Sequence, residues 1–346
     1  MKFFGTRTVA PDDVSGSSGG TPLLGRRVRR PKVGLALGAG VARGWAHIGI
    51  LRELEANGFV PDIVAGTSVG AVAGGCFCAG ALDNLEDFAR SLSRRKVLGL
   101  MDLSFSGAGL IGGGRLKRKL DEAIGTQRIE DVGRKFAAVA TEMGTGHEIW
   151  LSRGPMVEAI RASYALPGLF EPVRIGSRWL FDGAMCNPVP VTVCRALGAD
   201  FVIAVDLIAE ADRRSTVIHD GAVFEDAVSE IEAAEAPAEI ADAGKGFFAG
   251  IRRRARLGGR LRDQQNGAPG IASAMIEAIS ITQDRIARSR LAGDPPDMQI
   301  AARVGKIGLF EFHRADELIA LGREAVRKSL PDLTERLTAT PAGQFA

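Results

Sequence analysis

The sequence predicts an α/β fold in which a mostly parallel sheet is covered by helices on both faces. Two continuous apolar segments, 33–37 and 63–65, are each followed by a segment with helical spacing, at 41–57 and 69–79. Strands and helices that alternate through short links are typical of parallel sheets, whose strands are apolar throughout because both faces are buried. At 346 residues, the chain is long enough for one large α/β domain or two ordinary ones.

The rest of the chain continues this pattern and predicts one domain over residues 31–330. The further strands expected are 136–140, 147–151, 178–181, 201–205 and 298–300. The further helices expected are 155–162, 190–197, 271–291 and 315–329. Residues 1–30 are rich in Gly, Ser, Pro and Arg, which predicts a flexible leader, and residues 331–346 are expected to form a C-terminal tail.

The bulk composition is that of a soluble globular protein, with 46% hydrophobic residues, 25% charged residues and a net charge of +3. The N-terminus lacks the apolar core of a signal peptide, and no stretch reaches the roughly 20 apolar residues of a membrane span. We therefore expect a cytoplasmic protein without a nucleic-acid partner. The four cysteines form neither a C-x-x-C pair nor a cluster with histidine, so no metal site or disulfide framework is expected.

An insertion at 209–270 separates the strand at 201–205 from the helix at 271–291. Acidic residues dominate its first half, whereas residues 245–262 combine arginines with large apolar residues. One interpretation is a solvated or partly disordered segment whose opposite charges pair with one another. The other is a basic amphipathic helix at 245–262 that contacts an anionic membrane at its inner face.

A G-x-S-x-G motif joins the second expected strand to its helix. It runs from Gly66 to Gly70 with Ser68 at its centre. In a nucleophile elbow, a serine projects from a sharp strand-to-helix turn, nearby glycines avoid steric clashes, and the helix N-terminus contributes positive potential. Ser68 is therefore the candidate nucleophile.

A glycine-containing loop follows the first strand and could supply backbone donors for an oxyanion. Its residues are Gly38, Ala39, Gly40, Val41, Ala42 and Arg43. In a parallel sheet, this loop lies at the same carboxyl edge as the turn that carries Ser68. A dinucleotide fingerprint is the competing interpretation, with Asp62 as the ribose ligand. It is weakened because Arg43 stands where a third glycine is needed and because Asp62 precedes its strand.

Histidine is the usual base for a serine nucleophile, but no histidine of the chain has an obvious place beside Ser68. The four are His47, His147, His219 and His313. Asp182 fits better, because it ends the expected strand 178–181 and precedes Gly183, which allows a sharp turn. An unperturbed aspartate, with a pKa of about 3.9, is a weak base, so this role requires partial burial and direct contact with the serine hydroxyl. An ordinary Asp-Gly turn is the alternative.

Three motifs in this order, 38–44, 66–70 and 182–183, resemble the patatin-like phospholipase family, in particular its bacterial branch of small single-domain members. The resemblance covers about residues 32–208 and resumes at 271–330. It extends through three further segments, which are 45–51, 161–170 and 187–190.

The resemblance implies a three-layer sandwich that hydrolyses lipid acyl esters without a metal or other cofactor. It implies Ser68 as nucleophile, Asp182 as base and the loop 38–43 as oxyanion hole. Ala39 and Val41 stand where the family commonly has glycine, so their N–H groups stay aligned only if these residues can hold the required backbone angles.

Two interpretations remain open at this level. Arg43 is either a structural or anion-orienting residue beside the oxyanion hole or an exposed residue on the first helical turn. The whole protein is either a phospholipase or lysophospholipase, or a membrane-associated regulatory or scaffold protein that keeps the fold with weak activity.

Overall fold

The structure, a computed structural model, describes residues 30–95, 114–208 and 271–339. Contacts between Cα atoms divide the chain into one unit of residues 1–209 and 280–346 and a second unit of residues 210–279. Residues 271–279 are the described part of the second unit, and they form the first turns of a helix. The sheet and the candidate site belong to the first unit.

The described residues form an eight-stranded sheet in the order β5-β6-β3-β2-β1-β7-β8, with β4 paired to β3. The strands are β1 (Val33–Leu37), β2 (Ile63–Thr67), β3 (Lys135–Glu142), β4 (Glu148–Leu151), β5 (Val173–Ile175), β6 (Arg178–Asp182), β7 (Phe201–Asp206) and β8 (Met298–Ala301). Strands β1, β2, β3, β7 and β8 pair in parallel, whereas β4, β5 and β6 pair antiparallel. The predicted mostly parallel sheet is confirmed.

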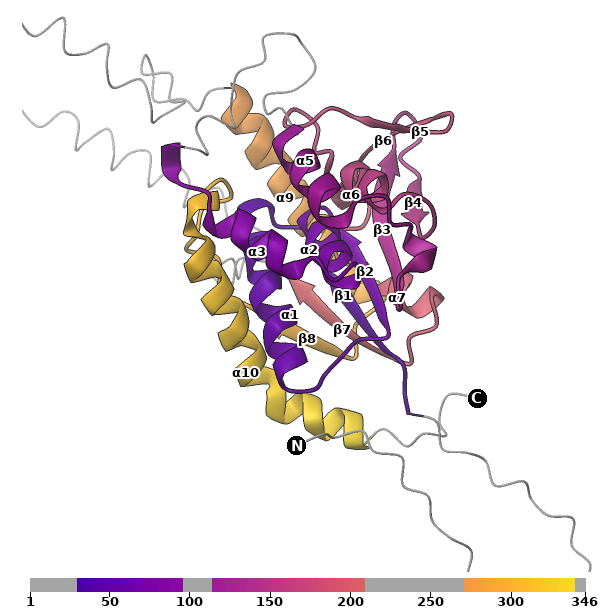
Figure 1. Ribbon diagram of the computed structural model, residues 1–346, viewed down its shortest axis with the longest axis vertical. Coiled ribbons are helices and arrows are strands. Elements are labelled where there is room, and N and C mark those ends of the chain that lie inside the picture. Colours follow the sequence, from indigo (N-terminus) through magenta and orange to yellow (C-terminus); the bar gives the residue numbers. More distant parts are fainter. Residues whose placement is uncertain (1–29, 96–113, 209–270, 340–346) are drawn as a thin grey trace, which may run out of the picture. The chain divides into compact units, whose positions relative to one another are not determined.

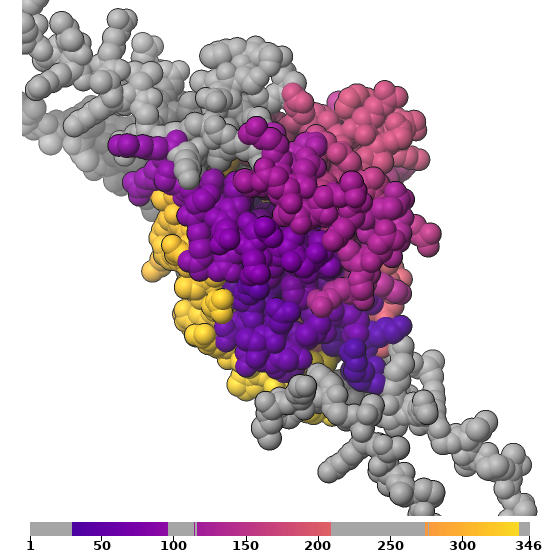
Figure 2. Space-filling view, viewed as in Figure 1, coloured from indigo at the N-terminus to yellow at the C-terminus, as the bar shows by residue number. Residues whose placement is uncertain are grey.

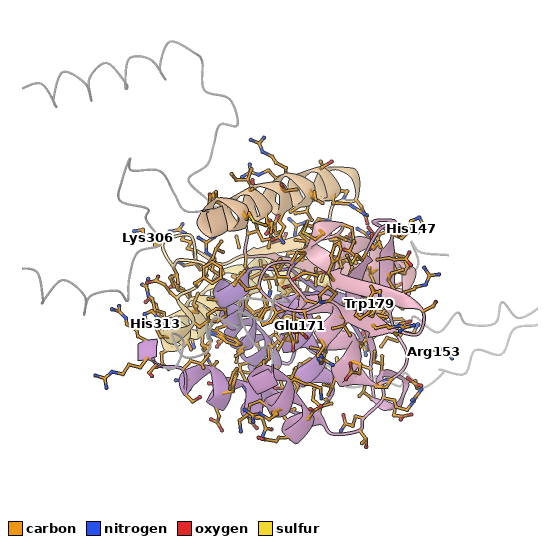
Figure 3. The ribbon with its side chains drawn as sticks, turned by 90° about the horizontal axis from the view of Figure 1, so that it is seen from above. His147, Arg153, Glu171, Trp179, Lys306 and His313 are labelled. Atoms are coloured by element: carbon orange, nitrogen blue, oxygen red, sulfur yellow. The ribbon has the colours of Figure 1, made fainter. Side chains whose placement is uncertain are left out.

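Helices cover both faces of this sheet. They are α1 (Ala46–Ala56), α2 (Val69–Cys78), α3 (Leu82–Arg90), α5 (Gly114–Ile124), α6 (Met156–Tyr164), α7 (Val191–Ala196), α9 (Ile271–Gly293) and α10 (Ala315–Ala339). Neighbouring residues of β1 point to opposite faces: Leu35 belongs to the core shared with α1, α2, α6 and α10, and Ala36 to the core shared with α7 and Ala287 of α9. Figure 3 shows the purple helices on one side of the sheet; on the other side, the part of α9 that belongs to the first unit packs through Ala287.

Helices α1 and α10 are far apart in the sequence but pack closely side by side, as the ribbon shows (Figure 1). Glycines permit this approach, because a Cβ at Gly49 would lie 2.0 Å from the carbonyl oxygen of Ile319. A Cβ at Gly322 would lie 2.1 Å from the carbonyl oxygen of Ala46. The yellow C-terminal helix consequently lies directly against the indigo N-terminal part of the molecule (Figure 2).

The register of β3 places the ends of β2 and β6 next to each other. Ala138 pairs with β2 on one edge and with β4 on the other, and Ala140 pairs with β4 and β6. Strands β2 and β6 therefore share one edge of β3. Along that edge, Thr67 is opposite Val139 and Asp182 is opposite the next residue, Ala140. The chain thus brings Asp182 to the end of β2, where Ser68 begins the turn.

Some expected boundaries are wrong. The segment expected as one helix over 41–57 begins with a 3-10 helix, Val41–Trp45, before α1. The last helix was expected to end at Ser329, but α10 continues through Pro331 to Ala339, so the first part of the expected tail is helical. Leu333 is fully buried, and this packing supports the helix beyond the proline.

Three elements were not expected, namely α3, α5 and β5. Residues 1–29 of the expected leader, 1–30, and the whole insertion 209–270 lie outside the described residues. The proposed membrane contact of the segment 245–262 therefore stays a prediction. Within the described parts of the chain, no helix has the length and apolar character needed to cross a membrane.

Candidate active site

The hydroxyl of Ser68 donates a hydrogen bond to Oδ2 of Asp182 at 2.6 Å. The two residues are 114 positions apart in the chain, and both are buried, with relative exposures of 8% for Ser68 and 1% for Asp182. A short bond between a hydroxyl and a carboxylate is a strong, charge-assisted one. The serine and the aspartate that the sequence singled out therefore lie in direct contact.

Asp182 is buried and hydrogen-bonded to backbone groups on either side. Its Oδ1 accepts a hydrogen bond from the N–H of Ala184 at 2.8 Å, and its own N–H donates to the carbonyl of Ala165 at 2.9 Å. Burial raises the pKa of Asp182 to about 7, although the hydrogen bonds from Ser68 and Ala184 oppose this rise. A carboxylate with this pKa is a much better proton acceptor at neutral pH than an exposed aspartate.

Ser68 occupies a strained backbone conformation, with φ 57° and ψ −125°. Positive φ is unusual for a residue other than glycine and is typical of functional turns. Three glycines at the site have a steric reason here, since a Cβ added to any of them would lie within 2.5 Å of a backbone atom. The three positions are Gly66 at 2.5 Å from Ala71, Gly70 at 2.1 Å from Leu37 and Gly183 at 2.2 Å from Val139.

The loop that follows β1 is held by hydrogen bonds from several directions. The N–H of Gly38 donates to the carbonyl of Val205 at 2.9 Å, and that of Ala39 donates to the carbonyl of Pro188 at 3.0 Å. Val41 has φ 50°, so it holds a left-handed conformation although it is β-branched. Within the described residues, the N–H groups of Gly40 and Val41 have no intramolecular acceptor.

Arg43 is buried and links this loop to the segment that follows β8. Its Nε donates to the carbonyl of Ile307 at 2.8 Å, and its Nη2 donates to the carbonyl of Gly305 at 3.2 Å. The N–H of the preceding residue, Ala42, donates to the carbonyl of Leu309 at 3.0 Å. The interpretation of Arg43 as an exposed residue is wrong, because the segment after β8 covers its side chain.

His47 of α1 is also fully buried, and its Nε2 lies 2.8 Å from the carbonyl oxygen of Gly38. Because a carbonyl can only accept, Nε2 carries the proton, and Nδ1 is left without a partner among the described residues. Burial lowers the pKa of His47 to about 4, against the opposing effect of this hydrogen bond. His47 is therefore a neutral core residue whose hydrogen bond holds the loop 38–43 at Gly38.

No histidine in the described part of the chain contacts Ser68. His147 is exposed in the turn before β4, and His313 lies next to Arg94, at the opposite side of the molecule (Figure 3). His219 lies outside the described residues. Asp62 accepts from the N–H of Val33 and pairs with Arg30 at the amino edge of the sheet. It is thus remote from the glycine loop at the carboxyl edge, which argues against the dinucleotide interpretation.

Two buried residues beside the site had no role assigned from the sequence. Ser163 of α6 accepts the N–H of Ser68 at 3.0 Å. Asn187 accepts the hydroxyl of Thr67 at its carbonyl and donates its own N–H to the carbonyl of Gly183, both at 2.8 Å. Both lie in segments that carry the family resemblance, but their contacts join positions about 95 and 120 residues apart, which no local pattern reveals.

All four cysteines are free, and Cys76 and Cys194 are buried. Burial raises the pKa of both thiols to about 12, so these residues behave as small apolar core residues.

Comparison with known proteins shows which family this chain resembles. The family model of the patatin-like phospholipases matches residues 35–195. An uncharacterized NTE family protein from Mycobacterium tuberculosis is 34% identical over 329 residues, which cover 87% of this chain and 91% of the relative. A second NTE family protein from that species is 31% identical and covers 92% of this chain and 50% of the relative. A lysophospholipase from Emericella nidulans is 32% identical over 189 residues, 53% of this chain and 12% of that protein.

The three-layer sandwich, with a serine on the bend between β2 and α2, defines an α/β protein with a mostly parallel central sheet. Because the match extends over nearly the whole of both chains, the protein belongs to the patatin-like phospholipase family, with its NTE members as relatives. Membership in this family implies a lipid acyl hydrolase.

Proposed function

We propose that this protein hydrolyses acyl esters of phospholipids or lysophospholipids with a Ser68–Asp182 dyad. The observation that carries the proposal is the 2.6 Å bond between the serine hydroxyl and a buried carboxylate whose pKa is raised to about 7. A serine that lies against such a base can lose its proton as it attacks, without a histidine.

The first half of the reaction forms an acyl-enzyme. Asp182 accepts the proton of Ser68 while Oγ attacks the ester carbonyl carbon, and the carbonyl oxygen becomes an oxyanion. When the intermediate collapses, the bond to the alcohol breaks, and Asp182 returns its proton to the departing oxygen. The products of this half are a free alcohol, such as a lysophospholipid or a glycerophosphodiester, and an ester at Ser68.

Water completes the cycle by the same steps. Asp182 takes a proton from the attacking water, a second oxyanion forms and collapses, and the proton passes to Oγ of Ser68. The fatty acid then leaves and the serine is restored. Each proton removed is returned within the same half-reaction, so the dyad ends the cycle unchanged.

We assign the oxyanion hole to the loop 38–43, with the N–H groups of Gly40 and Val41 as donors. The other loop N–H groups already donate within the protein, namely those of Gly38, Ala39, Ala42 and Arg43. Val41 shows that a β-branched residue can hold a left-handed conformation in this loop, where the family commonly has glycine. Fixed backbone donors of this kind stabilise the charge that develops in the transition state.

The relatives support a lipid substrate. The matching family is described as patatin-like phospholipases, and the Emericella nidulans relative is named a lysophospholipase. The substrate of a phospholipase A carries two acyl chains, whereas that of a lysophospholipase carries one. Assays with both lipids therefore distinguish the two activities.

The decisive experiment combines covalent labelling with substitution. A fluorophosphonate probe should label Ser68 in the intact protein, and Ser68→Ala and Asp182→Asn should each lower ester turnover by at least about 10³-fold. Since the two groups act as a unit, the double variant should be little worse than either single one. Ser177→Ala, at an exposed serine, is the control and should keep full turnover.

Near-normal turnover by either single variant would refute the dyad. A folded protein that is not labelled and does not hydrolyse either lipid would instead favour the regulatory or scaffold interpretation.

A further inference from the structure

A buried serine of α6 fills a gap in the hydrogen-bond ladder beside Ser68. The ladder between β2 and β3 is parallel, with Ile63 opposite Lys135 and Thr67 opposite Val139. Its phase is set by the N–H of Lys135, which donates to the carbonyl of Asp62 at 3.2 Å. In a parallel ladder this pattern repeats every two residues, so the N–H of residue 68 should donate to the carbonyl of residue 139.

In the structure, the side chain of Ser163 lies between these two backbone groups. The N–H of Ser68 donates to Oγ of Ser163 at 3.0 Å, and the hydroxyl of Ser163 donates in turn to the carbonyl of Val139 at 2.6 Å. A serine hydroxyl can donate and accept at once, so Ser163 satisfies both backbone groups that the interrupted ladder leaves. Ser163 is fully buried, which leaves no solvent to replace it. The chain can therefore leave β2 at Ser68 and adopt its positive φ without orphaned polar groups.

The same end of α6 also holds the base. The carbonyl of Ala165, two residues after Ser163, accepts the N–H of Asp182 at 2.9 Å. Helix α6 packs against β3 and β6, and the ribbon shows it over this part of the sheet (Figure 1). The backbone N–H groups of Ser68 and Asp182 are thus both held by one short stretch of chain, residues 163–165.

We propose that Ser163 is a positioning residue for the Ser68–Asp182 pair, a role that rests on the proposed function for its effect on turnover. Without its hydroxyl, the N–H of Ser68 and the carbonyl of Val139 either stay unpaired or close the gap by bonding directly. Direct closure shifts Ser68 toward β3 by about the width of an oxygen atom and changes the geometry of its contact with Asp182. Misplacement of a reacting group by about 1 Å can lower a rate by about 100-fold.

The test compares three variants. Ser163→Ala removes the hydroxyl, Ser163→Thr keeps it, and Ala159→Gly loosens the same helix at a buried position that is one turn away. We expect Ser163→Ala to lower kcat by about 10- to 100-fold while KM changes less than about threefold. We expect Ser163→Thr to recover most of this loss, and Ala159→Gly to lower Tm without a comparable fall in kcat.

A second measurement does not depend on activity. Amide hydrogen exchange at Ser68, followed by NMR, should accelerate by about tenfold or more in Ser163→Ala relative to Ala159→Gly. The amide of Ala71, which donates to the carbonyl of Ser68, should change much less.

The outcomes separate this proposal from the proposed function. A kcat for Ser163→Ala within twofold of that for Ala159→Gly would overturn the positioning role, and so would an unchanged exchange rate at Ser68. If the wild-type protein hydrolyses no acyl ester but Ser68 exchange accelerates in Ser163→Ala, the dyad proposal fails while the bridging role of Ser163 is upheld.

Discussion

The two loops that build the candidate site follow neighbouring parallel strands and share the same kind of backbone. The elbow, 66–70, begins at the end of β2, and the loop 38–43, which we propose as the oxyanion loop, follows β1. Each contains one non-glycine residue with positive φ, Ser68 at 57° and Val41 at 50°, and these are the two such residues in the described parts of the chain. Strain of this kind persists only where the surrounding structure fixes it.

The two loops differ in what fixes them. The elbow is held from the antiparallel side of the sheet, by Ser163 of α6 and Asp182 of β6. The oxyanion loop is held from the other side, by β7, by His47 of α1, and by the segment after β8 through Arg43. Both loops also donate a hydrogen bond to the segment 187–188, but their other supports differ, so changes at Arg43 or His47 should leave the proposed nucleophile in place.

The largest separable effect is expected from Arg43→Met. The variant leaves carbonyls of the segment 305–307 without their charged donor, so the free energy of unfolding should fall by about 2 to 4 kcal/mol. Misaimed oxyanion donors should lower kcat by about 100-fold. The pH dependence should still rise through about pH 7, because Asp182 is untouched.

Arg303→Met, at an exposed arginine of the same segment, is the matched control and should behave as wild type. If Arg43→Met also shifted the acidic limb of the pH profile, the two supports would not be independent.

The elbow side predicts a stability effect that depends on pH. The pKa of Asp182 is raised from 3.8 to about 7, so between these values the folded protein keeps a proton that the unfolded chain has lost. The contribution of Asp182 to stability therefore decreases as pH rises from about 4 to 7. Asp182→Asn removes this penalty, and its free energy of unfolding relative to wild type should rise over that range, by up to about 4 kcal/mol.

Chemical denaturation at several pH values measures this difference. The exposed Asp131→Asn serves as a control for the loss of one carboxylate. Parallel stability curves for wild type and Asp182→Asn from pH 4 to 8 would show that burial does not perturb Asp182 in solution.

A smaller effect is expected at His47. His47→Leu removes the donor to the carbonyl of Gly38, so the loop should hold its N–H groups less well aligned. If this costs about 1.4 kcal/mol of transition-state stabilisation, kcat falls about tenfold. His47→Gln keeps a side-chain N–H and should lose less. Since the pKa of His47 is lowered to about 4, neither variant should alter the shape of the activity profile between pH 5 and 8. Equal losses in both variants would mean that packing, not the hydrogen bond, is what His47 contributes.

The smallest effect is expected at Val41. Val41→Gly removes backbone strain of about 1 to 3 kcal/mol in the folded state. The glycine also makes the unfolded chain more flexible, which costs about 0.5 to 1 kcal/mol of stability. The free energy of unfolding should therefore rise slightly, and kcat should stay within about threefold of wild type. Val60→Gly, at an exposed position without positive φ, should instead lower stability. A change of the same sign in both variants would argue against strain at Val41.

Local patterns in the sequence were sufficient for much of the fold. Apolar runs predicted the strands at the centre of the sheet, and G-x-S-x-G predicted the bend at Ser68, because buried parallel strands and tight turns restrict residue type position by position. The short edge strand β5 and the polar helices α3 and α5 were missed, since outer elements bury less and carry a weaker pattern. The end of α10 was missed because Pro331 is a local stop signal that tertiary packing overrides.

The sequence by itself determined which residue types stand at the carboxyl edge of the sheet: a serine on a bend, an aspartate before a glycine, and a loop with small residues. The tertiary structure decided which of them meet. The contact between Ser68 and Asp182 depends on β6 taking over the edge of β3 where β2 ends. The buried supports Ser163, His47 and Arg43 likewise bond to backbone groups that only the folded chain brings near. Their roles come from the satisfaction of buried polar groups across the fold, and such pairing leaves no periodic trace in the sequence.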